Sequence, residues 1–280
     1  MNSAELKENL TQRAKNTKHE LKPWMKIFAR IGFMTKGFVF ILVGILSLLA
    51  AAGIGGKAKG TNGAIEAVAT KPFGEALLWV IAVGLLGYII WLLIKIIEIK
   101  SLKKKEVKGW TTKAGDIISC VIYIGIAYKA FSFAIHAGST GDSKQTWTAM
   151  ILATDAGPWL IGLIGLGIIA NGIFQIYSGW KEKFMSQFKV TEMSDTEIEA
   201  AKKSGKIGFI ARGLIFSFLG FFVTRMAITS DSDNPKGLDE ALQKLLQQDY
   251  GSYMLGIVSI GLAFYGMYEI LKGKNKYLDL

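Results

Sequence analysis

Two segments of the chain, 176 residues apart, have nearly the same sequence. Residues 31–44 read IGFMTKGFVFILVG and residues 207–220 read IGFIARGLIFSFLG, so six of fourteen positions are identical. Lys36 in the first copy is matched by Arg212 in the second. Each copy continues into a long apolar run, and internal repeats of this kind are typical of membrane proteins built from duplicated groups of helices. The repeat therefore predicts a membrane-spanning architecture in which equivalent helices recur.

The composition supports the same interpretation. Apolar residues make up 51% of the 280 residues, and the mean hydropathy of +0.34 is high for a soluble domain. Six apolar runs are long enough to cross a bilayer, which requires roughly 20 residues. These runs cover residues 33–53, 76–96, 116–137, 157–178, 208–229 and 252–271. The first 26 residues are polar and basic, and we expect no cleavable signal peptide because a short apolar core is missing there.

The distribution of basic residues predicts the orientation. The two terminal stretches and the two connections on the same side hold 23 of the 33 Lys and Arg residues, whereas the other three connections hold 6. Basic residues concentrate on the cytoplasmic side of membrane proteins. We therefore expect a protein of the cytoplasmic (inner) membrane with both termini in the cytoplasm. The net charge of +11 is then explained by topology and by attraction to the anionic headgroups of the lipid bilayer, and we do not expect a nucleic-acid partner.

A third, divergent copy lies between the two similar ones. The second apolar run of each unit carries a Gly, then an aromatic or amide side chain four residues later, then an aromatic residue three further on. Spacings of four and three place these side chains on one helix face. The three sets are Gly84, Tyr88 and Trp91; Gly167, Asn171 and Phe174; and Gly261, Tyr265 and Tyr268. We interpret the three glycines, together with Tyr88 and Tyr265, as packing positions of the repeats.

The expected fold is an all-α integral membrane protein with six transmembrane helices in three parallel two-helix repeats. Because each unit has an even number of spans, all units enter from the same side, and approximate threefold pseudosymmetry about the membrane normal is expected. Residues 1–30 are predicted to form a basic cytoplasmic tail or an amphipathic helix on the membrane surface. The repeats are expected at 31–100, 110–181 (divergent) and 207–273.

The outer connections are predicted to contain short interfacial helices, each followed by a Gly that turns the chain back into the membrane. These helices are expected at Ala64–Ala69, Gln145–Ala153 and Leu238–Leu246, and the Gly residues are Gly74, Gly157 and Gly251. Glycines seven residues apart lie on one helix face, where two backbones can approach closely. We interpret such glycines as helix-packing positions, with gating as the alternative: Gly37, Gly44, Gly213 and Gly220.

The layout resembles a bacterial family known as domain of unknown function 1206. The resemblance rests on the IGF-x-x-[Lys/Arg]-Gly-x-x-Phe segments, on Pro72-Phe73-Gly74 and on Gly84-Leu85-x-x-Tyr88. It covers roughly Ile31 to Lys272 and is weakest in the middle unit, where Asn171 replaces Tyr. The family implies a bacterial membrane protein of paired spans, and it implies no activity and no catalytic residue.

Four polar residues inside the predicted spans are candidates for a functional site. Lys129 and Arg225 occupy equivalent positions near the outer ends of the third and fifth spans. They predict either an outward-facing anion site or cations that reach lipid phosphate or an outer carboxylate. Asn171 and Gln175 lie four residues apart on one face, where they predict hydrogen bonds between helices or a polar cavity lining. Glu98 and Glu269 lie beside Lys95 and Lys272, and local ion pairs are expected for them.

The motifs of known enzyme classes are largely absent from the sequence. There is no His-Glu-x-x-His, no Gly-x-Ser-x-Gly and no paired Cys, and the two His residues and Cys120 make no metal-binding set. We therefore expect no catalytic residues, no metal and no cofactor. Three functions stay open: a structural or interaction role in the membrane, which is favoured; a small transporter or channel for an anionic or lipidic solute; and, least favoured, a membrane enzyme. A substrate, protein partners and the oligomeric state are not predicted.

Overall fold

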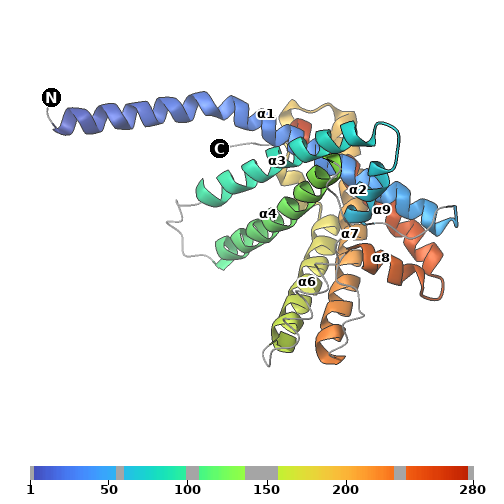
Figure 1. The fold of residues 1–280 in the computed structure, drawn as a ribbon. Coiled ribbons are helices and arrows are strands. Elements are labelled where there is room, and N and C mark those ends of the chain that lie inside the picture. Colours follow the sequence, from blue (N-terminus) through green and yellow to red (C-terminus); the bar gives the residue numbers. More distant parts are fainter. Residues whose placement is uncertain (1–2, 55–59, 99–106, 136–156, 230–237, 277–280) are drawn as a thin grey trace.

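The computed structural model describes residues 3–54, 60–98, 107–135, 157–229 and 238–276, and these are almost entirely helical (Figure 1). The long helices are α1 (Ser3–Ala51), α3 (Gly74–Glu98), α4 (Val107–Ala134), α6 (Gly157–Trp180), α7 (Asp195–Thr229) and α9 (Gly251–Asn275). Five of them, all except α4, are long and apolar enough to cross a membrane, and the apolar part of α4 is Ser119–Ala134. Helices suit hydrocarbon because each satisfies its own backbone hydrogen bonds. The prediction of an all-helical membrane protein is confirmed.

The basic amino-terminal segment is helical and continuous with the first apolar run. In Figure 1 the first half of α1 projects away from the other helices, and the second half packs among them. No break separates the two halves, since helix α1 is recorded over Ser3–Ala51 without interruption. Residues 3–30 are therefore helical, and the position of this helix on the cytoplasmic membrane surface stays a prediction.

Short helices occur in the connections that follow α1 and α7, as the sequence predicts. Helix α2 (Thr61–Ala69) follows α1, and helix α8 (Leu238–Leu246) follows α7. Each buries its apolar face, with Ile65 and Val68 in the first case and Leu242 and Leu245 in the second. Helices α2 and α8 also contact one another. The third predicted helix, Gln145–Ala153, lies outside the described residues.

The turn from each short helix into the next span has the same backbone geometry in the first and third units. Phe73 and Tyr250 adopt left-handed conformations with φ of 63° and 58°, and each directly precedes the Gly that begins α3 or α9. A Cβ atom on Gly74 would collide with the carbonyl oxygen of Val68, and one on Gly251 would collide with that of Leu245. These two positions therefore require Gly because the backbone of the preceding helix lies against them.

We expect Gly74→Ala to loosen this turn and to lower the free energy of unfolding by about 1–3 kcal/mol, since the clash is with backbone and not with a movable side chain. The measurement is thermal unfolding of the purified protein in detergent. Gly53→Ala is a useful comparison, because a Cβ there meets nothing within 4 Å although φ is +72°. A larger loss for Gly53→Ala than for Gly74→Ala would show that backbone strain matters more than the close approach.

The long helices pack in a chain of neighbours that nearly closes on itself. The packed pairs are α1 with α3, α3 with α4, α6 with α7, α7 with α9, and α9 with α1. One further pair, α4 with α6, would close a ring, but it is not among the packed pairs of the described residues. Figure 1 shows these two helices diverging from one another. The middle unit is thus the one in which the two spans do not pack against each other.

Equivalent glycines form the two tightest seams between units. A Cβ on Gly37 of α1 would lie 2.5 Å from the carbonyl oxygen of Gly266 in α9. A Cβ on Gly213 of α7 would lie 2.6 Å from the carbonyl oxygen of Gly172 in α6. Gly44 and Gly220, one further pair of equivalent positions, likewise lie against backbone of the opposing helix. Close backbone approach through small residues is the usual way in which membrane helices associate.

The connection between α6 and α7 folds back against the third unit. It contains two short 3₁₀ helices, η2 (Lys183–Gln187) and η3 (Val190–Glu192). The ring of Phe184 is buried against Tyr268, with the ring centroids 5.3 Å apart. Helix α7 then begins with a reciprocal cap between Ser194 and Glu197, in which the Ser194 backbone N–H donates to the carboxylate at 3.1 Å.

Candidate functional site

A buried ion pair joins the first and third units. Lys36 of α1 donates from Nζ to Oε1 of Glu269 in α9 at 3.0 Å. Both side chains are almost fully buried, at 6% and 1% side-chain exposure. Lys272, one turn further along α9, approaches the same oxygen at 3.7 Å. Burying charges among apolar helices is costly unless they are paired, so this carboxylate holds two cations in place.

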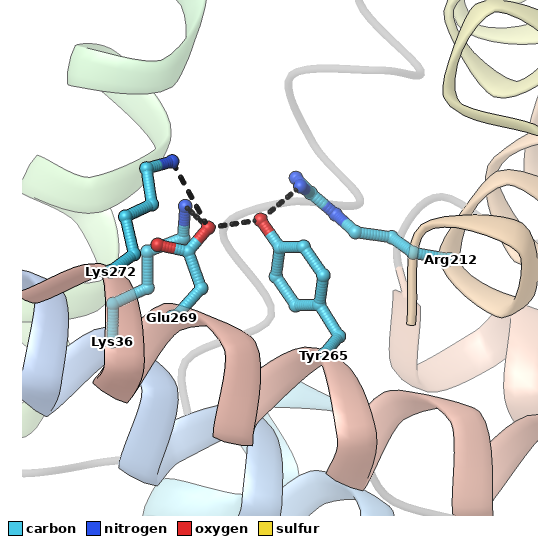
Figure 2. A network of polar contacts seen from close by, with 5 residues as sticks. All are labelled: Lys36, Arg212, Tyr265, Glu269 and Lys272. Atoms are coloured by element: carbon cyan, nitrogen blue, oxygen red, sulfur yellow. Dashed lines mark hydrogen bonds and ion pairs between the residues drawn. The ribbon is translucent and has the colours of Figure 1, made fainter. Parts of the chain in front are cut away.

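The pair extends through a tyrosine to the cation of the third unit. The hydroxyl of Tyr265 donates to Glu269 Oε1 at 2.5 Å and accepts a hydrogen bond from Arg212 at 2.6 Å. Figure 2 shows Lys36, Glu269 and Lys272 on one side of the Tyr265 hydroxyl and Arg212 on the other. The two matching cations of the repeated segments, Lys36 and Arg212, are therefore linked by one Tyr and one Glu, both of which belong to α9.

Aromatic rings surround the cations of this network. The Lys36 ammonium lies 5.1 Å from the ring centre of Tyr88 in α3 and 5.4 Å from that of Tyr123 in α4. Lys276, just past α9, is buried and lies 3.7 Å from the ring of Trp91. Arg212 lies over the ring of Tyr265 at 4.6 Å. We call this group, Lys36, Arg212, Tyr265, Glu269, Lys272 and Lys276, the cationic cluster.

The cationic cluster has more positive than negative charge. It contains four basic side chains and one carboxylate, Glu269, whose Oε1 faces Lys36 and Lys272. Among the described residues, Arg212 and Lys276 form no ion pair with a carboxylate, and Arg212 Nε is buried without a hydrogen-bond partner. A nearby pair, Lys95 with Asp116 at 2.7 Å, is neutral as a unit and leaves the excess unchanged. The arrangement is suited to holding an anion through charge-assisted hydrogen bonds.

Comparison with known proteins now adds to the geometry. The family model described as Domain of Unknown Function (DUF1206) matches the chain three times, at residues 31–95, 114–182 and 207–276. The chain belongs to the DUF1206 family. It is also similar to "Uncharacterized protein YxxB" of Bacillus subtilis (strain 168), with 40% identity over 261 residues, 93% of this chain and 94% of that protein. No solved structure matches the chain.

The three DUF1206 matches correspond to three pairs of long helices, α1 with α3, α4 with α6, and α7 with α9. Lys36 and Arg212 occupy the same position in the first and third matches, and Tyr88 and Tyr265 occupy another shared position. Both tyrosines are buried. In the middle match the tyrosine position holds Asn171, which is exposed. The cationic cluster therefore uses shared positions of the first and third repeats, and the middle repeat contributes Tyr123.

The four polar residues singled out from the sequence lie apart from the cationic cluster. Lys129 of α4 forms an ion pair with Glu66 of the short helix α2. This is the pairing with an outer carboxylate that the sequence left open as an alternative to an anion site. Arg225 is exposed on α7. Whether these two cations bind an anion together stays a prediction.

Asn171 and Gln175 bond to one another within α6. Gln175 Nε2 donates to Asn171 Oδ1 at 2.8 Å, so this hydrogen bond lies within one helix and not between helices as expected. Gln175 is buried, and its Oε1 has no hydrogen-bond partner among the described residues. The equivalent positions of α9 are also joined by a hydrogen bond, but there the earlier residue, Tyr265, donates to Glu269 four residues further on. Gln175 and Glu269 occupy equivalent positions in the second and third units.

The packing glycines of the second spans behave differently from one another. A Cβ on Gly84 would collide with Thr35, and a Cβ on Gly261 would collide with Ala211, so each lies against the first span of its own unit. Gly167, the equivalent glycine in α6, has nothing within 4 Å of such a Cβ among the described residues. The expected packing therefore does not hold at Gly167, because α4 does not pack against α6 there.

Sequence reasoning assigned Glu269 to a local ion pair and missed its principal partner. The pair with Lys272 exists, but the shorter contact is with Lys36, 233 residues away in the chain. Lys95 was likewise expected to pair with its neighbour Glu98, whereas it pairs with Asp116 of α4. The available signal was the repeat itself, since the shared cation position implied that Lys36 and Arg212 face a common axis.

Proposed function

We propose that this DUF1206 protein binds a phosphate-bearing anion at the cationic cluster, either as a lipid headgroup or as a soluble phosphate compound. The observation that carries the proposal is the unbalanced charge of Arg212 and Lys276, which form no ion pair with a carboxylate among the described residues. An Arg guanidinium offers a planar pair of donors that matches phosphate, and a Lys ammonium adds a point charge. The contacts around the site are thus those of a receptor for an anion.

The cost of burying these cations is larger than the gain from their aromatic contacts, which favours the binding of an anion. Each cation–π contact contributes about 0.5–2 kcal/mol. Removing a Lys or Arg side chain from water costs several kcal/mol after relaxation, roughly two to three times as much. The contacts of Lys276 with Trp91 and Phe33, at 3.7 and 4.3 Å, therefore offset only part of that cost. An anion bound at the cationic cluster supplies the remainder.

We further propose the topology that brings this site to the inner leaflet. In this topology helix α4 is a span in addition to the five apolar helices, which makes six. Its 28 residues have a length of about 42 Å, and the hydrocarbon core of a bilayer is roughly 30 Å thick. The three repeats lie around an approximate threefold axis, and the excess of basic residues on one side of the membrane supports an inner-membrane location with both termini in the cytoplasm. The cationic cluster then lies toward the cytoplasmic side, close to anionic headgroups.

The proposed role is binding, without catalysis. The Glu269 carboxylate is held by Lys36, Lys272 and Tyr265, which suits a structural anchor better than a group that must gain and lose protons. A structural role in the membrane, favoured by the sequence, is compatible with a bound anion that holds the units together. Transport of the anion is the second candidate, and the unpaired helices α4 and α6 are the observation that favours it.

The test uses glycerol 1-phosphate, a phosphate headgroup without acyl chains, and measures its effect on thermal unfolding of the purified protein in neutral detergent. We expect glycerol 1-phosphate to raise the melting temperature of the wild type. The double variant Arg212→Gln/Lys276→Gln is expected to bind it about tenfold more weakly or worse, since two charge-assisted hydrogen-bond partners are lost.

The matched control is Lys202→Gln/Lys203→Gln, which removes the same charge from exposed positions of α7. This control is expected to respond to glycerol 1-phosphate like the wild type. Equal responses of the cluster variant and the control variant would contradict the proposal, because binding would then follow net charge and not the cationic cluster.

A further inference from the structure

One face of α6 is exposed at positions that are buried in the equivalent helices. Phe174 is 61% exposed, whereas its counterparts Trp91 and Tyr268 are 8% and 0% exposed. Ile164 is 50% exposed, whereas its counterparts in α3 and α9, Ile81 and Val258, are 1% and 7% exposed. The same residue positions are therefore core in two units and uncovered in the third.

The cause is the separation of α4 from α6. In the first and third units this face packs against the first span of the same unit, through Gly84 on Thr35 and Gly261 on Ala211. In the middle unit the equivalent glycine, Gly167, meets nothing within 4 Å among the described residues. We call the surface formed by Ile164, Gly167, Asn171 and Phe174 the open face of α6.

Helices beside the open face contribute residues to the cationic cluster or to its surroundings. Helix α4, on one side of the opening, contributes Tyr123, whose ring lies 5.4 Å from the Lys36 ammonium. Helix α7, which packs against α6 on the other side, contributes Arg212. Figure 2 shows Arg212 reaching from its helix toward Tyr265, with Lys36 and Lys272 opposite. The helix that carries the open face is thus packed against the helix that carries Arg212.

We infer that the open face of α6 holds one anionic phospholipid, with its phosphate at Arg212 of the neighbouring helix α7 and an acyl chain along the open face. The inference rests on the proposed function and names its ligand class. Charge complementarity decides the occupant: a lipid supplies an apolar chain and a negative headgroup together, whereas an apolar helix of a partner protein leaves Arg212, whose Nε has no hydrogen-bond partner among the described residues, without a negative charge. Asn171, which is exposed on the open face, offers a polar side chain to the glycerol ester groups.

The test is native mass spectrometry of the full chain in neutral detergent with dioleoyl phosphatidylglycerol. We expect one lipid to bind the wild type, with dioleoyl phosphatidylcholine binding more weakly. Gly167→Trp is expected to bind phosphatidylglycerol about tenfold more weakly, as follows if the indole displaces about two methylene groups of the chain. Ile164→Trp is a second variant on the same face, and both substitutions enter open space, so folding is preserved.

The matched control is Ile173→Trp, which adds an indole to an exposed position on the outward side of α6. It is expected to bind phosphatidylglycerol like the wild type. If Gly167→Trp and Ile164→Trp also bind like the wild type while glycerol 1-phosphate still stabilises the protein, the lipid inference is overturned and the anion site stands. If neither ligand binds the wild type, both proposals fail.

The oligomeric state in the same spectra shows whether a second copy of the chain, and not a lipid, covers the open face of α6. A wild-type dimer that Gly167→Trp converts to a monomer, with phosphatidylglycerol binding unchanged, would show that the open face is a contact between two copies, and would overturn the lipid inference. Loss of phosphatidylglycerol binding without a change of oligomeric state supports it.

Discussion

Replacement of Glu269 by Gln is expected to lower the free energy of unfolding by about 3–5 kcal/mol, because it leaves buried cations without their carboxylate. Lys36 loses its only ion-pair partner among the described residues, and Lys272 loses the same oxygen. Gln keeps the shape of the side chain, so the loss reports charge and not volume. The measurement is thermal unfolding in detergent, followed by tryptophan fluorescence.

A double-mutant cycle separates the pair from its surroundings. Lys36→Met removes the facing charge and keeps an apolar side chain of similar length, so Lys36→Met/Glu269→Gln is expected to recover part of the loss. Glu199→Gln is the matched control, since Glu199 pairs with Lys203 four residues away on an exposed helix surface. Exposed pairs contribute at most about 1 kcal/mol. A loss for Glu269→Gln as small as that of Glu199→Gln would contradict a central role for the buried pair.

Features that depend on local sequence were predictable. The long apolar runs predicted the long helices, because hydrocarbon admits little else than a helix with its own hydrogen bonds satisfied. The apolar stripe of residues 238–246 predicted α8 with the observed bounds. Gly74, Gly157 and Gly251 begin α3, α6 and α9, as their place before each apolar run indicated. In each case the signal lies within a few residues of the feature.

The cationic cluster was not predictable in the same way. Its central contact joins residues 233 positions apart, and an isolated Glu beside a Lys on one helix face is explained equally well by a local pair. The sequence instead drew attention to Lys129, another charged residue inside a predicted span. In the structure Lys129 pairs with Glu66 in the short helix α2. A charged residue inside an apolar run can be recognised from the sequence. Its partner depends on how helices that are far apart in the sequence pack against each other.

The sequence predicted one of the two ways in which the middle unit differs from the others. Divergence of its first span was evident, since the paired Gly residues and the basic residue are missing there. The second span retained Gly167, which predicted that packing was retained as well. Two helices pack closely only if both have a suitable surface. When one helix loses that surface, a glycine on the other helix that is shared by all three repeats is left without a contact.

The same helix therefore offers an internal comparison of a packed and an unpacked glycine. A Cβ on Gly172 would lie 2.7 Å from the Gly213 carbonyl oxygen, whereas one on Gly167 meets nothing within 4 Å among the described residues. We expect Gly172→Leu to lower the free energy of unfolding by about 3 kcal/mol or more, because overpacking here pushes against backbone. Gly167→Leu is expected to change it by less than about 1 kcal/mol, since it adds a side chain to an exposed helix position.

The size of the first effect follows from how α6 is held. Its buried apolar contacts are few, formed by Ile161 with Val223 and Ala227 of α7, so the seam of small residues carries most of the attachment. Gly213→Leu, which approaches the same seam from α7, is expected to match Gly172→Leu. The measurement is thermal unfolding of the three variants in detergent, compared with the wild type. If Gly167→Leu is as damaging as Gly172→Leu, then α4 does pack against α6 in the folded protein, and the opening beside the cationic cluster does not exist.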